Sequence, residues 1–141
     1  MQVTDGDPRS GLITVPSAFA VREATDRLEQ RIREAGLQVF ARIDHAANAS
    51  GVGLALRPME LLLFGHPRGG TPLMQDNPLC GIDLPVRALV WEDGEGAAWL
   101  TYNDARWLAR RHDLSSAAAA TIETIRVGLA RIAAAVERTA D

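Results

Sequence analysis

Apolar and polar positions alternate along several short stretches, and these predict the strands. The stretch LQVFARID alternates strictly, so its residues point in turn to the two faces of a sheet. The stretch MELLLF is apolar at both parities, which is typical of a central strand. The turn DGEG joins the last two strands as a hairpin. The predicted strands are residues 12–16, 37–44, 59–64, 86–92 and 97–102.

Apolar positions that recur every three to four residues predict the helices. Ser17 can cap a helix over 18–35, and Gly36 can end it. A last helix follows Ser115 or Ser116, and its apolar stripe is Ile122, Ile125, Leu129, Ile132 and Val136. Shorter helical segments are expected at 45–51 and, after Asn103, at 104–111. The order predicts an α+β two-layer sandwich with an antiparallel sheet, β-α-β(4)-α. Residues 1–10 are expected to form a flexible N-terminal tail, before a single domain at 11–141.

The sheet is expected to be apolar on both faces. One face, toward the helices, is assigned Val39, Ile43, Val86 and Val90. The opposite face then carries Phe40, Leu89 and Trp91, with more apolar groups from the central strand. Such a patch is rarely bare on a monomer. Either a second copy covers it, or loops and the 104–111 helix fold over it; the homodimer is favoured.

Composition narrows the class of protein. The 141 residues are 47% hydrophobic and 23% charged, which fits one globular domain. The net charge of -3, with no dense cluster of arginines, argues against a nucleic-acid partner. No apolar run is long enough to cross a membrane, and no secretion signal begins the chain. One cysteine cannot form an internal disulfide, so a cytoplasmic location is expected.

All 15 basic residues are arginines, which excludes lysine chemistry. The segment GHPRGGT follows an apolar strand and resembles a phosphate-binding loop, but it lacks the lysine that such a loop uses. Pro78 also limits the predicted helix to 72–77, with Thr71 as its N-cap. Gly69, Gly70 and Arg68 could bind a small anion there. A plain turn and helix start is the favoured alternative.

Metal and acid–base chemistry find weak support. His45, His66, His112 and Cys80 lack the spacing of a metal site, and no cofactor fingerprint occurs, so neither a metal nor a cofactor is predicted. Asp44 with His45, and Asp83, are the best acid–base candidates, since each lies at a strand terminus. Capping or turn formation is the commoner role for such aspartates. Cys80 is expected to be a small buried apolar residue.

Three strings carry a resemblance over about Leu12 to Val136: FARIDHAANASGVGLALRPMELLLFGHPRGGTPLM, IDLPVRALVWED and WLTYNDARWLARRH. They resemble the domain-of-unknown-function 302 family of bacteria and archaea. The resemblance implies a β-α-β(4)-α fold and no established activity. His66 departs from the asparagine expected there, which puts a turn or ligand contact in doubt. Arg68 and Arg87 replace the lysines frequent in the family and keep the charge.

Three functions are weighed. A dimeric module that binds a small acidic or polar ligand ranks first, with a pocket between Arg87, Tyr102, Asn103 and the loop 66–74. A structural or protein-interaction domain ranks second. A small enzyme that uses Asp44 or Asp83 with a histidine ranks third, and no catalytic residue is assigned. The ligand-binding hypothesis names Asp44, His45, His66, Arg68, Thr71, Asp83, Arg87, Tyr102 and Asn103.

Overall fold

The core of the fold is a five-stranded antiparallel sheet. The computed structural model describes residues 11–139, so the tail expected at 1–10 lies outside the described residues. The strand order is β1-β5-β4-β3-β2, with every neighbouring pair antiparallel. This confirms the predicted α+β class, and each strand lies within a residue of its expected bounds. The strands are β1 (Leu12–Pro16), β2 (Gln38–Asp44), β3 (Met59–Gly65), β4 (Val86–Glu92) and β5 (Ala98–Asn103).

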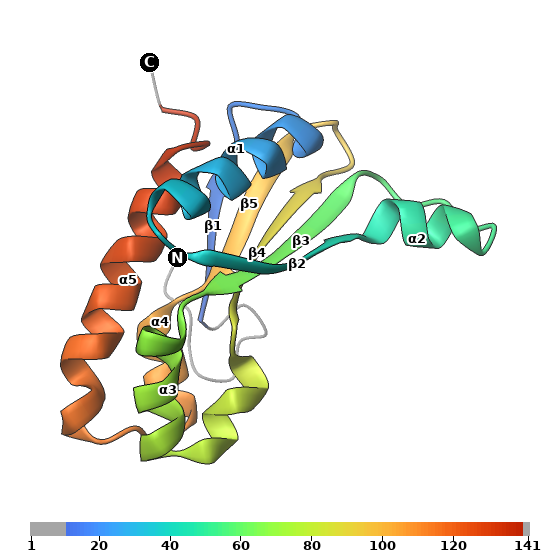
Figure 1. Cartoon of the computed structure of the whole chain (residues 1–141). Helices are drawn as coiled ribbons and strands as arrows, with labels where there is room; N and C mark the ends of the chain where they lie inside the picture. The colour runs from blue at the N-terminus through green and yellow to red at the C-terminus, as the bar shows by residue number, and fades with distance from the viewer. Residues whose placement is uncertain (1–10, 140–141) are drawn as a thin grey trace.

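Helices form the second layer. The two longest, α1 (Val21–Glu34) and α5 (Ala119–Ala134), lie on one face of the sheet, while α3 and α4 gather beyond its lower end and α2 projects away from the body (Figure 1). The shorter elements are α2 (His45–Gly51), α3 (Pro67–Asp76), η1 (Pro78–Asp83), α4 (Ala105–Arg111) and η2 (Ser116–Ala118). The chain therefore places several short helices between and after the strands of the expected order.

Two apolar clusters hold these layers together. The larger lies between the sheet and the helices α1 and α5, and includes Leu28, Ile32, Leu62, Phe64 and Val136. The smaller lies beyond the end of the sheet and consists of Leu73, Cys80, Ala105, Leu108, Ala118 and Ile122. Cys80 is fully buried, which confirms its predicted apolar role. Burial raises the pKa of its thiol, which makes it a poor nucleophile at neutral pH.

The first helix begins later than the sequence predicts. The Ser17 hydroxyl donates to the Phe19 carbonyl at 2.7 Å and accepts from the Phe19 amide at 3.1 Å, so it builds a turn rather than a cap. The backbone bends at Ala18 and Phe19, Ala20 is extended, and α1 begins at Val21 with no side-chain cap. Ser17 is also bridged to Glu137, which holds it in line with the strand.

Helix α3 differs from its predicted bounds more than α1 does. It begins at Pro67, not at Pro72, because the His66 ring caps it: His66 Nδ1 accepts from the Arg68 amide at 3.1 Å. Pro67 suits the first helical position, where no backbone donor is needed. Thr71 is therefore a residue inside the helix and not its N-cap, and Pro72 also lies inside.

Two other helix starts differ in their capping residue. Asp104 caps α4 by accepting from the Arg106 amide at 3.0 Å, because Asn103 still belongs to β5. Ser115 does not cap α5: its amide and hydroxyl donate to the Asp76 carboxylate at 2.7 and 2.9 Å. These two bonds tie the approach to α5 to the end of α3.

A register shift in β2 changes the expected faces of the sheet. The shift lies between Val39 and Ala41, and it inverts the side-chain parity that follows. Val39 packs against the larger cluster as predicted. Ile43, however, pairs with Leu61 and points away from the helices, so its assignment to the helix face is wrong. Phe40, at the shift, lines a cleft on the helix side instead of joining the opposite face.

The opposite face keeps the other predicted apolar side chains. Leu61, Leu89, Trp91 and Trp99 alternate with core residues along β3, β4 and β5 and belong to neither cluster. The two tryptophan rings stack with their centroids 6.3 Å apart. Trp91 Nε1 also donates to Thr101 Oγ1 at 2.9 Å, so its polar atom is satisfied. This face is half-exposed and predominantly apolar.

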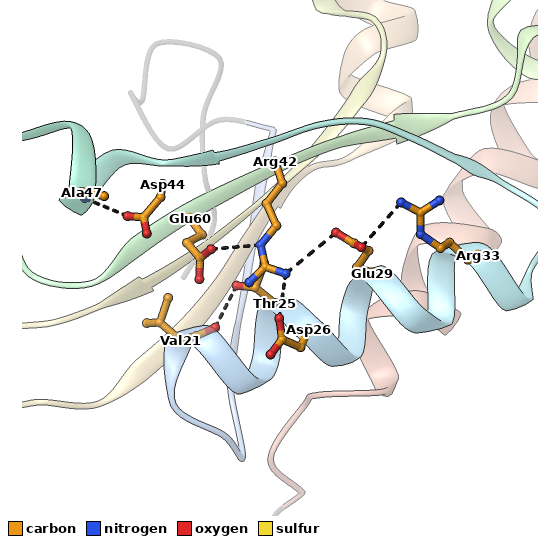
Figure 2. A network of polar contacts seen from close by, with 9 residues as sticks. All are labelled: Val21, Thr25, Asp26, Glu29, Arg33, Arg42, Asp44, Ala47 and Glu60. Carbon is orange, nitrogen blue, oxygen red and sulfur yellow. Dashed lines mark hydrogen bonds and ion pairs between the residues drawn. The ribbon is translucent and has the colours of Figure 1, made fainter.

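A polar network near the carboxyl end of β2 joins the sheet to helix α1. Arg42 points to the helix side, where Nε donates to Glu60 Oε1 at 2.9 Å and Nη1 donates to Asp26 Oδ1 at 2.7 Å (Figure 2). Glu29 of α1 lies 3.8 Å from the same Nη1. Glu60 is buried, so Arg42 supplies the charge that compensates its carboxylate.

Candidate functional site

The main candidate site is a cleft of about 630 Å³ between the sheet and its helical layer. That volume lies within the range of small-molecule sites. Side chains from α1, β2, the end of β3, α3, the start of β4 and α5 line it. Its apolar wall is made by Leu37, Phe40, Phe64, Met74, Leu84, Pro85, Val86, Ile125, Leu129 and Ile132.

Helical spacing explains how two helices contribute to the cleft. Thr124, Gly128 and Arg131 recur on α5 at intervals of four and three residues, which places them on one face. Arg31 and Ala35 follow the same rule at the end of α1. At Gly128 an added Cβ would meet nothing within 4 Å, so this glycine leaves space in the cleft rather than fitting a tight contact.

The charged groups of the cleft are few and of one sign. Arg31 and Arg131 line it, together with His66, and none of the described lining residues is acidic. His66 Nδ1 accepts the Arg68 amide, so the ring proton in this arrangement lies on Nε2. The cleft therefore combines an apolar wall with positive charge.

The structure brings only part of the predicted site to this cleft. His66 and Thr71 line it, through α3 and its cap. Arg68 lies in α3 and is exposed, outside the lining. Asp44 and His45 lie at α2, where Asp44 Oδ1 accepts from the Ala47 amide at 2.8 Å and caps the helix.

Asp83 is engaged in a contact between η1 and α4. It accepts from Arg111 Nη1 at 3.0 and 3.1 Å, and its Oδ2 lies 2.5 Å from His112 Nε2. His112 is buried, and its carbonyl accepts from Asn77 Nδ2 at 2.6 Å. These bonds tie together the segments around the smaller apolar cluster, which is a structural role.

The remaining predicted residues do not form the expected pocket. Asp83, Arg87 and Asn103 border a void of about 10 Å³, which is about the space of one water molecule. Arg87 Nε is buried there without a hydrogen-bond partner among the described residues. Tyr102 belongs to the larger apolar cluster, and burial raises the pKa of its hydroxyl. The structure therefore does not bring Arg87, Tyr102, Asn103 and the loop 66–74 together around one pocket, because strand parity turns Tyr102 into the core while the loop faces α5.

Sequence reasoning missed the two arginines and the glycine of the cleft. The sequence pattern places Arg31 on a solvated helix face. It explains Arg131 as a positive charge that suits the end of a helix. Gly128 inside an alanine-rich helix is the signal that could have pointed here, since glycine in a helix interior weakens it and needs a reason. The partner helix could not be inferred from spacing alone.

Over residues 11–139, no three histidine, cysteine, aspartate or glutamate side chains gather closely enough to hold a metal ion. Within the same range, no helix has both the length and the apolar character needed to cross a membrane.

An antiparallel α+β sandwich with a ligand-sized cleft between its layers is the class that the fold and site define. The chain belongs to the family described as domain of unknown function DUF302, whose model matches residues 13–132. This confirms the family indicated by the three sequence strings. The crystal structure of an uncharacterized conserved DUF302 protein from Bacillus stearothermophilus has the same fold. Its TM-score is 0.80 at 20% identity, over 91% of this chain and 99% of that chain.

Two curated relatives are more similar to this chain in sequence than that crystal structure is. The protein named fluoride-specific ion channel FluC 1 of Brucella suis biovar 1 is 48% identical over 119 residues, covering 84% of this chain and 47% of the relative. Its namesake in Brucella abortus biovar 1 shows the same identity over the same length, covering 44% of that relative. The chain thus spans less than half the length of these curated relatives.

Proposed function

We propose that this protein is a cytoplasmic, dimeric module that binds a small molecule with an apolar body in the cleft between α1, α3 and α5. The observation that carries the proposal is the cleft itself, with its predominantly apolar lining and about 630 Å³ of space. Clefts of this size and lining are the usual form of a small-molecule site. The space at Gly128 adds support, because it is room that the fold leaves unfilled.

Binding ranks above catalysis for chemical reasons. Acid–base work needs a titrating pair that faces a substrate-sized space. Asp83 is bonded to both Arg111 and His112, and it borders the small void rather than the cleft. Within the described chain, the lining of the cleft includes the His66 imidazole but no carboxylate.

The proposal is tested by filling the cleft from Gly128. N-phenyl-1-naphthylamine, a neutral apolar fluorophore, is titrated into the protein, and we expect saturable enhancement with one site per chain. Gly128→Leu should abolish it, because the new side chain enters the cleft, and the helix gains rather than loses propensity. Gly51→Leu is the matched control: it is also a helical glycine with open space, but it lies on α2. Unchanged fluorescence in Gly128→Leu would overturn the proposal.

A second candidate function rests on the curated relatives. Their names as fluoride-specific channels, at 48% identity over 119 residues, favour a role of this domain beside such a channel. The matched segment is less than half of each relative, so we propose association with fluoride transport rather than conduction. Sodium fluoride that raises the melting temperature, where equal sodium chloride does not, would favour this candidate; identical curves would remove it.

The dimer is proposed from the apolar sheet face. Leu61, Leu89, Trp91 and Trp99 present adjacent half-exposed apolar surface without joining either cluster. Apolar patches of this kind on soluble proteins mark interaction sites. In a two-fold symmetric dimer, this patch on one copy would pack against the same patch on the other copy.

A further inference from the structure

The charge of the cleft contrasts with that of the whole chain. The protein carries 18 acidic residues and a net charge of -3. Yet the lining drawn from the described residues includes two arginines and no acid. An acidic protein that keeps one apolar cleft positive has a surface suited to an anion.

The two cleft arginines differ from three other arginines on the same helices, whereas Arg22 of α1 also has no ion pair within residues 11–139. On α1, Arg27 and Arg33 pair with Glu23 and Glu29 at 3.1 and 3.5 Å. On α5, Arg126 pairs with Glu123. By contrast, Arg31 and Arg131 form no ion pair with any residue in 11–139. Their guanidinium groups keep their donors for another partner.

We propose that the ligand is an apolar carboxylate, with its head bound by Arg31 and Arg131 and its apolar chain on the cleft wall. This deepens the proposed function and rests on it. The planar guanidinium group offers paired donors that match a carboxylate, which makes arginine the residue suited to such recognition. Phe40, Phe64 and Met74 supply apolar surface for the chain of the ligand.

An alternative role for both arginines is purely structural. Each lies in the last turn of its helix, where positive charge interacts favourably with the helix dipole. That role predicts a change in stability on substitution and no change in ligand preference. The two roles are therefore separable by measuring binding and melting temperature on the same variants.

The experiment compares two ligands that differ only at the head. Decanoate and 1-decanol each displace N-phenyl-1-naphthylamine from the full chain at concentrations below aggregation. We expect decanoate to bind at least about tenfold more tightly, since a hydrogen bond to a charged group is worth that factor or more. Arg31→Gln and Arg131→Gln should each lose about tenfold in decanoate affinity and leave 1-decanol unchanged. Arg33→Gln, an exposed arginine outside the cleft lining, is the control and should change neither.

Each result decides a separate claim. Equal affinity for decanoate and 1-decanol in the natural chain overturns the carboxylate proposal, while the cleft function stands if Gly128→Leu still abolishes fluorophore binding. Altered melting without altered preference in the arginine variants also overturns it and assigns them to the helix ends. Failure of the fluorophore to bind the natural chain overturns the proposed function itself.

Discussion

At the scale of single residues, the β4–β5 turn is organised by one carboxylate. Asp93 accepts from Trp99 Nε1 at 2.8 Å and from the amides of Glu95 and Ala97 at 2.9 Å each. The tryptophan hydrogen bond, followed by the two amide bonds, lowers the pKa of Asp93 below its ordinary value. The charged form is therefore the one that the folded turn prefers.

The lowered pKa of Asp93 predicts the direction in which the stability of the fold changes with pH. Because folding lowers the Asp93 pKa, its contribution is present above the ordinary carboxyl range and disappears as the pH falls through the folded-state pKa. Asp93→Asn should be less stable than the natural chain near neutral pH, with a difference that narrows in acid. Urea unfolding at about pH 7 and about pH 3 measures it. Glu95→Gln, in the same turn, is the control, and a difference that stays constant with pH would contradict the prediction.

A second residue-scale prediction concerns Arg42 and Glu60. Removal of Arg42 leaves the buried Glu60 carboxylate without its compensating charge, which is costlier than losing the pair. Arg42→Met should lower the free energy of unfolding by about 2 kcal/mol, below the range for fully buried pairs because Arg42 keeps some solvent contact. Arg42→Met with Glu60→Met should recover most of that loss.

The control for this cycle is a comparable pair on the surface. Arg33 and Glu29 lie 3.5 Å apart and are more exposed, so Arg33→Met should cost less than about 0.5 kcal/mol. Chemical denaturation of the single and double variants gives the coupling energy. A double variant whose loss equals the sum of its two single losses would show that the pair carries no special coupling.

At the scale of elements, strands and helices differ in how far the sequence predicts them. The strands follow closely from alternation and apolar content, and β4 has its expected bounds. Helix starts are less predictable because they depend on which side chain reaches a free amide. The cap of α3 is a histidine ring nitrogen, and α1 has no side-chain cap at all, so the usual serine and threonine signals mislead at both.

The candidate site, too, could be predicted from the sequence only in part. His66 and Thr71 could be found in the sequence because their segment is rich in glycine and proline, which marks an unusual connection. Arg31, Gly128 and Arg131 come from helices distant in the chain, and only tertiary packing brings them to one cleft. The register shift at Phe40 moved another residue into it, and no local pattern announces such a shift.

At the scale of the whole molecule, the two faces of the sheet serve different purposes in the proposed function. One face packs under α1 and α5 and borders the cleft, and the other is left half-exposed with its apolar side chains. Because the cleft lies on the helical side, two copies could pair through the open face without blocking it. Ligand binding and dimerisation are therefore expected to be independent.

This independence can be tested with a single charge on the open face. We expect the natural chain to be a dimer by light scattering at micromolar concentration, and Leu89→Glu to be a monomer, because a carboxylate there would be buried without a partner in the dimer. Leu89 is half-exposed in one copy, so the variant should still fold and still bind the fluorophore. Ile82→Glu, at an exposed apolar residue of η1, is the control and should stay dimeric. A natural chain that is monomeric under these conditions would contradict the dimer, and the open face would then be a solvated surface of a single molecule.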